Sequence, residues 1–182
     1  MVIWVTGLSG AGKTTLCQAL CQLLKPRLPQ LVLLDGDAMR SVFNHEIGYR
    51  EVDRLAHVRR IQRLAKLLSD QGQVVLTAVL YSHPDLLSWN REHLQPYVEI
   101  YLRAPLEALR QRDTKDLYAK ALAGERVHVV GVDIPWHAPQ QADLVIDMNH
   151  LESPEQLART VIAAIPQLRQ MFDGAHVHAL HQ

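Results

Sequence analysis

Residues 7–14 read Gly7-Leu8-Ser9-Gly10-Ala11-Gly12-Lys13-Thr14, which matches the pattern G-x-x-x-x-G-K-[ST] at every fixed position. The apolar run Val2–Thr6 before it predicts a strand, and the residues after it predict a helix that ends near Leu24. Glycines in such a turn let backbone N–H groups point at phosphate oxygens, and the helix N-terminus adds partial positive charge behind them. The stretch therefore predicts a phosphate-binding loop, or P-loop.

The polar side chains of this loop have separate predicted tasks. Lys13 is expected to reach the β- and γ-phosphates of a bound nucleotide, and the Thr14 hydroxyl is expected to ligate Mg²⁺. The residues predicted to bind the nucleotide here are Gly7, Leu8, Ser9, Gly10, Ala11, Gly12, Lys13, Thr14 and Thr15.

The rest of the chain alternates short apolar runs with longer helical patterns, as βαβ units on a parallel sheet do. Their nearly continuous apolar character is typical of strands that helices cover on both faces. The predicted fold class is therefore α/β, a P-loop NTPase-type parallel sheet with helices on both faces and a short lid near residues 112–126. Further strands are predicted over Leu31–Leu34, Gln73–Ala78, Tyr97–Leu102 and Leu144–Asp147, and further helices over Glu51–Ser69, from Pro105, and from Ser153 toward Ala164.

Composition limits the possible settings of the protein. A chain of 182 residues predicts a single domain, 1–182, in which the histidine-rich tail 173–182 is expected to be flexible. Lys+Arg and Asp+Glu number 19 each, which argues against binding to nucleic acid or membranes driven by net charge. The two cysteines, Cys17 and Cys21, form no disulfide framework, so a cytoplasmic location and buried thiols are expected. The oligomeric state stays open, with a homodimer as one expectation.

A P-loop predicts a bound nucleotide but not its fate. A switch GTPase would need D-x-x-G after the third strand and N/T-K-x-D for guanine, and neither is present. Motor and transporter ATPases are usually larger and end the third strand in Asp, whereas the third predicted strand of this chain ends Thr77-Ala78-Val79. The class of P-loop protein that remains is a small-molecule kinase. The alternative from another class is a non-catalytic nucleotide-binding module, which the joint presence of Lys13, Thr14, Asp35 and Asp37 disfavours.

The acceptor side of the reaction is predicted from two places. Asp35 and Asp37 flank a glycine at the end of the second strand, where doubly wound sheets bind ligands, and Arg40 follows one turn later. One carboxylate near Mg²⁺ and the acceptor hydroxyl is what phosphoryl transfer requires. In the long helix, Arg54 and His57 continue an apolar stripe toward the same crevice, so we expect an anion to meet the arginine.

Several blocks of the sequence resemble adenylyl-sulfate kinases, in the order and near the spacing of that family. The blocks are Gly7–Thr15, Leu34–Arg40, Asp53-Arg54 with Arg59-Arg60, Val75–Ala78, Arg112–Tyr118 and Gly131–Pro139. The resemblance implies phosphorylation of the 3′-hydroxyl of adenylyl sulfate with Mg-ATP, so that small-molecule nucleotides are the expected partners.

The resemblance also implies roles for individual residues. Asp37 would be the catalytic carboxylate on the acceptor side, with Asp35 supporting it and the metal, while Arg40 and Arg54 would hold the acceptor's phosphate and sulfate. Tyr49 would stack on the acceptor base. Arg112 and Lys115 would belong to the lid over ATP, with Lys115 near the transferred phosphate and the acceptor.

Three departures from the family pattern concern the acceptor. His57 stands where the family usually has Asn, and Leu80–Pro84 replaces a segment that carries an arginine. Val129 stands at the position of a second aromatic ring around adenine, and losing a ring would remove about 1–3 kcal/mol of stacking. The pattern also fits kinases of another nucleotide-linked acceptor, such as the bacterial cytidine diphosphoramidate kinases.

Overall fold

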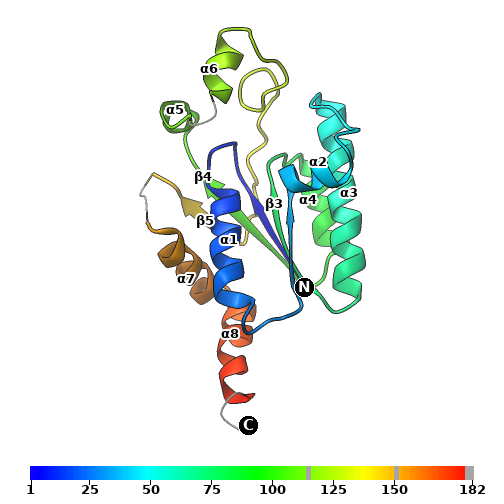
Figure 1. Cartoon of the computed structure of the whole chain (residues 1–182), viewed down its shortest axis with the longest axis vertical. Helices are drawn as coiled ribbons and strands as arrows, with labels where there is room; N and C mark the ends of the chain where they lie inside the picture. The colour runs from blue at the N-terminus through cyan, green and yellow to red at the C-terminus, as the bar shows by residue number, and fades with distance from the viewer. Residues whose placement is uncertain (114–115, 150–151, 179–182) are drawn as a thin grey trace.

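Figure 1 shows the computed structural model, which describes residues 1–113, 116–149 and 152–178, with side chains as far as residue 173. Within these residues the strands form one parallel sheet in the order β2-β3-β1-β4-β5. The strands are β1 (Val2–Thr6), β2 (Leu31–Asp35), β3 (Val74–Val79), β4 (Tyr97–Arg103) and β5 (Leu144–Asp147). The helices are α1 (Lys13–Leu24), α2 (Gly36–Val42), α3 (Glu51–Asp70), α4 (Pro84–His93), α5 (Leu106–Gln111), α6 (Leu117–Leu122), α7 (Pro154–Ala164) and α8 (Pro166–His178).

The strand order determines which face of the sheet each helix covers. The chain leaves β1 toward β2 in one direction across the sheet and then returns through β3 to β4 in the other. Because parallel crossovers are right-handed, α1 lies on one face, and α3 and α4 lie on the opposite face. Helix α7 packs against α1, whereas α3 packs against α4, and α5 and α6 project beyond the carboxyl ends of the strands (Figure 1).

The core lies between this sheet and its helices. Every residue of β1 and β3 is buried, which explains their unbroken apolar character. On α1 the buried residues recur at helical spacing and include Cys17, whose thiol contacts the carbonyl oxygen of Thr77 at 3.7 Å. Burial raises the pKa of both thiols; Cys17 is buried as predicted, whereas Cys21 is only partly buried.

The predicted fold class is confirmed, and most predicted boundaries are right within two residues. The short helices α2 and α6 were not predicted, and two longer segments also differ from the prediction. Helix α4 lies within residues 81–96, which the sequence pattern left unassigned; it begins at Pro84, with the His83 ring accepting the N–H of Asp85 as its cap. Helix α8 runs to His178 and so includes part of the predicted flexible tail, whereas residues 179–182 lie outside the described residues. Among the described residues, no helix combines the length and apolarity that crossing a bilayer requires.

Gly7 makes the closest backbone approach in the turn after β1. A Cβ at this position would lie 2.7 Å from the carbonyl oxygen of Leu102 on β4. We therefore expect Gly7→Ala to lower the free energy of unfolding by about 1–3 kcal/mol, because the sheet must separate to admit the methyl group. Urea unfolding measures the change. Ser9→Ala is the control, since it removes an atom from the same loop, and equal unfolding curves for Gly7→Ala and the parent would contradict the expected crowding.

Candidate active site

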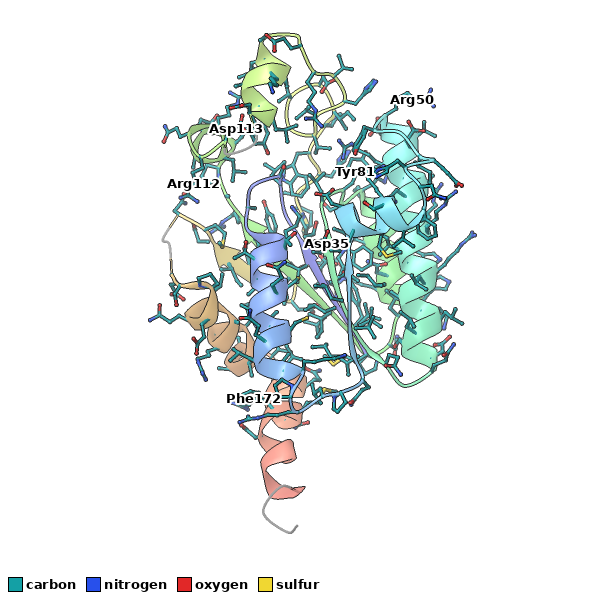
Figure 2. The ribbon with its side chains drawn as sticks, viewed as in Figure 1. Asp35, Arg50, Tyr81, Arg112, Asp113 and Phe172 are labelled. Atoms are coloured by element: carbon teal, nitrogen blue, oxygen red, sulfur yellow. The ribbon has the colours of Figure 1, made fainter. Side chains whose placement is uncertain are left out.

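One cleft of about 520 Å³ opens at the carboxyl ends of the strands and brings the predicted residues together. In Figure 2, Asp35 lies between Tyr81 on the α3 side and Arg112 and Asp113 on the α5 and α6 side. The sequence-predicted residues that line the cleft are Ser9, Gly10, Ala11, Gly12, Lys13, Thr14, Thr15, Asp35, Asp37, Arg40, Tyr49, Arg54, His57 and Arg112. Gly7 and Leu8 are buried and do not line the cleft.

The P-loop has the backbone of a phosphate cradle. Gly10 and Gly12 have φ angles of +79° and +93°, a left-handed conformation that side chains with a Cβ rarely adopt. The Lys13 ammonium donates to the carbonyl oxygens of Gly7 and Leu8, at 2.8 Å each, which holds it across the loop. Since Gly12 precedes the first residue of α1, the loop also lies at the positive end of the helix dipole.

Thr14 and Asp35 supply oxygen atoms of the kind that Mg²⁺ binds. The Thr14 hydroxyl donates to Asp35 Oδ2 at 2.7 Å, which joins the P-loop to the end of β2. Mg²⁺ is commonly held by one or two protein oxygens together with phosphate oxygens and water. This hydroxyl–carboxylate pair at the mouth of the cradle therefore fits the predicted metal site.

The two acids of the Asp35-Gly36-Asp37 turn are in different situations. Asp35 Oδ1 accepts the backbone N–H groups of Asp37 and Ala38, at 3.0 and 3.2 Å, and so caps α2. Asp37 lines the cleft, and in the part of the chain that the structure describes its carboxylate has no hydrogen-bond partner. The Asp35 carboxylate thus caps α2 and accepts from Thr14, while the Asp37 carboxylate is available to accept a proton.

Arg40 and Arg54 both lie against the ring of Tyr49. The Arg40 guanidinium carbon is 4.4 Å from the ring centroid, and that of Arg54 is 5.7 Å away. Arg40 donates to the carbonyl oxygens of Ile47 and Gly48 at 2.8 and 2.9 Å. Arg54 donates to those of Tyr49 and His128 at 3.0 and 2.7 Å. These carbonyls orient the guanidinium groups without neutralising them.

Burial makes this pair of arginines receptive to an anion. Desolvation is the main reason that the pKa of both Arg40 and Arg54 is lowered, and for Arg54 the nearby Arg40 lowers it further. Two partly buried cations that disfavour each other are stabilised by a shared negative charge. That an anion meets Arg54 stays a prediction, to which this pair of partly buried cations adds a physical reason.

His57 supports the turn that carries the two acids. Its Nε2 lies 2.9 Å from the carbonyl oxygen of Gly36. Burial lowers the pKa of His57, so the ring is neutral at pH 7, and the Gly36 carbonyl selects the tautomer with the proton on Nε2. His57 therefore donates to the backbone between Asp35 and Asp37.

Besides Gly7 and Leu8, two further predicted residues are not among the described residues that line the cleft. Lys115 lies outside the described residues. Val129 is 3% exposed, packs in the hydrophobic core and does not line the cleft, contrary to its predicted place beside the acceptor base. The physical reason is the turn around it, in which the Asp133 carboxylate accepts the N–H groups of His128 and Val129, both at 2.5 Å. The loop reaches the acceptor side through the His128 carbonyl instead.

Among the cleft residues that the sequence analysis did not predict as site residues are Tyr81, Asp113 and Tyr118. Tyr81 follows β3, is 2% exposed and donates its hydroxyl to Glu51. Asp113 and Tyr118 belong to the predicted lid segment, and Arg112 beside them donates to the carbonyl oxygen of Met148 at 3.2 Å. The position of Tyr81 just beyond a buried strand was a usable signal, because side chains there face the ligand crevice.

Known proteins resemble this chain over most of its length. The family profile described as adenylylsulphate kinase matches residues 1–147. The cytidine diphosphoramidate kinase of Campylobacter jejuni is 41% identical over 159 residues, which cover 86% of this chain and 92% of that protein. The adenylyl-sulfate kinase of Paraburkholderia xenovorans is 40% identical over 159 residues, covering 87% of this chain and 89% of that protein.

A solved structure has a similar fold. The APS kinase of Mycobacterium tuberculosis, in complex with AMPPNP and APS, matches with a TM-score of 0.80 at 32% identity. The match covers 90% of this chain and 95% of that one.

Proposed function

The chain belongs to the adenylylsulphate kinase family, and on that premise we propose that it transfers the γ-phosphate of ATP to the 3′-hydroxyl of adenylyl sulfate. The observation that carries the proposal is the composition of one cleft, which holds a phosphate cradle at one end and the Arg40–Arg54 pair on Tyr49 at the other. Asp37 lies in the same cleft. A nucleotide that bears a second anionic group suits this arrangement.

On the donor side, the backbone N–H groups of the P-loop and Lys13 bind and orient the phosphates of ATP. Thr14 and Asp35 hold Mg²⁺, which when bound neutralises charge on the β- and γ-phosphates. Arg112 lines the donor side of the cleft. The proposal also assigns Lys115, as the resemblance implies, to a place beside the transferred phosphate.

On the acceptor side, Asp37 accepts the proton of the 3′-hydroxyl as that oxygen bonds to the γ-phosphorus and the bond to ADP breaks. His57 holds the backbone of the Asp35–Asp37 turn, so it positions Asp37 from behind. Arg40 and Arg54 bind the phosphate and sulfate of the acceptor, and Tyr49 stacks on its base.

A second acceptor class deserves a direct comparison. Val129 has no ring and does not line the cleft, so Tyr49 has no aromatic partner at position 129 against which to hold an adenine base. The Campylobacter jejuni relative is named a cytidine diphosphoramidate kinase, so a cytidine-linked acceptor is the second candidate. ADP release with Mg-ATP and either adenylyl sulfate or cytidine diphosphoramidate separates the two. We expect adenylyl sulfate to give the higher kcat/KM, and turnover of the cytidine compound alone would overturn the choice of acceptor.

Arg54→Gln tests the anion site independently of the base. We expect KM for the acceptor to rise about ten- to a hundredfold, because a charge-assisted contact is lost, while KM for ATP stays within about twofold. Arg59→Gln is the matched control, since Arg59 is exposed on the same helix. Equal KM values for the acceptor in the two variants would contradict the assignment.

A homodimer and a cytoplasmic location stay predictions.

A further inference from the structure

Tyr118 attaches α6, which lies in the predicted lid, to the P-loop. Of the described residues in α6, Tyr118 is the buried one, with 2% of its surface exposed. Its hydroxyl donates to the carbonyl oxygen of Ser9 at 2.9 Å, across 109 positions of sequence. Burial raises the pKa of Tyr118 to about 12, so the hydroxyl keeps its proton and is the donor.

Asp113 determines where this tyrosine stands. Its carboxylate accepts the N–H groups of Leu117, Tyr118 and Ala119, at 2.8, 2.7 and 2.9 Å. These N–H groups belong to the first turn of α6, where they have no acceptor within the helix, so the Asp113 carboxylate caps the helix from outside it. Since Arg112 and Asp113 also line the cleft, the cap, the tyrosine and the cleft wall form one unit.

The carbonyl that Tyr118 holds belongs to a peptide group of the cradle. Because a peptide bond is planar and trans, the Ser9 C=O and the Gly10 N–H point in opposite directions. A hydrogen bond that fixes this carbonyl therefore also fixes the direction of the Gly10 N–H. The Ala11 N–H closes this turn by donating to the Leu8 carbonyl oxygen at 3.2 Å. Gly10 is exposed and has φ +79°, where glycine moves with little steric resistance, so the Tyr118 hydroxyl adds a second restraint on the peptide.

We propose that Tyr118 is a positioning residue that couples docking of α6 to the order of the phosphate cradle. When α6 is docked, the Gly10 N–H is held ready for a phosphate, and a bound phosphate in turn favours docked α6. Such coupling is reciprocal by thermodynamic linkage. The inference rests on the proposed function only in taking ATP as the ligand of the cradle.

The substitution Tyr118→Phe removes the hydroxyl and keeps the buried ring. We expect the dissociation constant for Mg²⁺ and the ATP analogue AMPPNP to rise about three- to tenfold, the range for one lost hydrogen bond. KM for ATP should rise by the same factor, while KM for the acceptor at saturating ATP stays within about twofold. Binding of AMPPNP needs no acceptor, so this result is independent of whether adenylyl sulfate is the acceptor.

Tyr97→Phe is the matched control. The Tyr97 hydroxyl donates to Glu99 at 2.9 Å and accepts from Asn90 at 3.1 Å, in a buried network that does not line the cleft. A general effect of losing a buried hydroxyl would appear in both variants as lower stability. An unchanged AMPPNP dissociation constant for Tyr118→Phe, or an equal rise for Tyr97→Phe, would overturn the proposal.

Hydrogen exchange on the parent protein tests the coupling without a substitution, should Tyr118→Phe fold poorly. Addition of Mg²⁺ and AMPPNP is expected to slow exchange in residues 7–14 and in residues 117–123 together. Slower exchange in the P-loop alone would show that the two segments are not coupled and would overturn the proposal.

Discussion

Replacing Lys13 by alanine is expected to lower kcat by about a hundredfold or more, because its ammonium stabilises charge on the transferred phosphoryl group. The melting temperature should change by no more than a few degrees. The Lys13 ammonium bonds to the carbonyl oxygens of Gly7 and Leu8 at the cleft, where water can replace it. Steady-state ADP release and thermal unfolding of the same preparation measure both quantities.

Lys66→Ala is the control for this experiment. Lys66 pairs with Asp70 on the outer part of α3, at 2.9 Å, and should affect neither turnover nor nucleotide binding. A Lys13→Ala protein that melts like the parent and keeps more than about a tenth of its kcat would remove Lys13 from the chemistry.

The second large effect is expected at Asp37. Asp37→Asn should lower kcat by about a hundredfold or more with KM for ATP within about twofold, because the amide cannot accept the acceptor's proton. The carboxylate lines the cleft and has no hydrogen-bond partner among the described residues, so its removal leaves no described donor unpaired. Single-turnover kinetics at saturating ATP and acceptor measure the step directly.

Asp35→Asn provides the contrast, since the two acids differ by their contacts. Asp35 caps α2 and accepts from Thr14, so its substitution should lower stability and raise the Mg²⁺ concentration needed for half-maximal turnover. If Asp37→Asn instead lowered stability and left turnover per folded molecule near normal, Asp37 would be a turn residue and its catalytic role would be wrong.

The sequence predicted correctly those structural features that are encoded within one short segment of the chain. The P-loop pattern, the buried parallel strands and the long helix α3 each carry their signal within a short segment, and the structure confirms them. The pair Asp35 and Asp37 was predictable because acids after a buried strand lie at the ligand edge of a parallel sheet.

Other features depend on contacts between distant residues and were not predictable in this way. Val129 is turned into the core by Asp133, four positions later, and no periodic pattern indicates that turn. Tyr118 and Ser9 are brought together only by the docking of α6 on the P-loop. The carbonyl partners of Arg54 likewise come from two separate loops, so the sequence could predict an anion but not the groups that orient the arginine.

The central claim is tested most directly by ³¹P NMR of the reaction of this protein with Mg-ATP and adenylyl sulfate. We predict that the γ-phosphate resonance of ATP disappears in step with a new phosphomonoester resonance, coupled to the 3′-proton of the ribose, and that ADP forms in equal amount. Lys13→Ala should give neither signal on the same timescale. Loss of the γ-phosphate to inorganic phosphate alone, with adenylyl sulfate unchanged, would contradict the account.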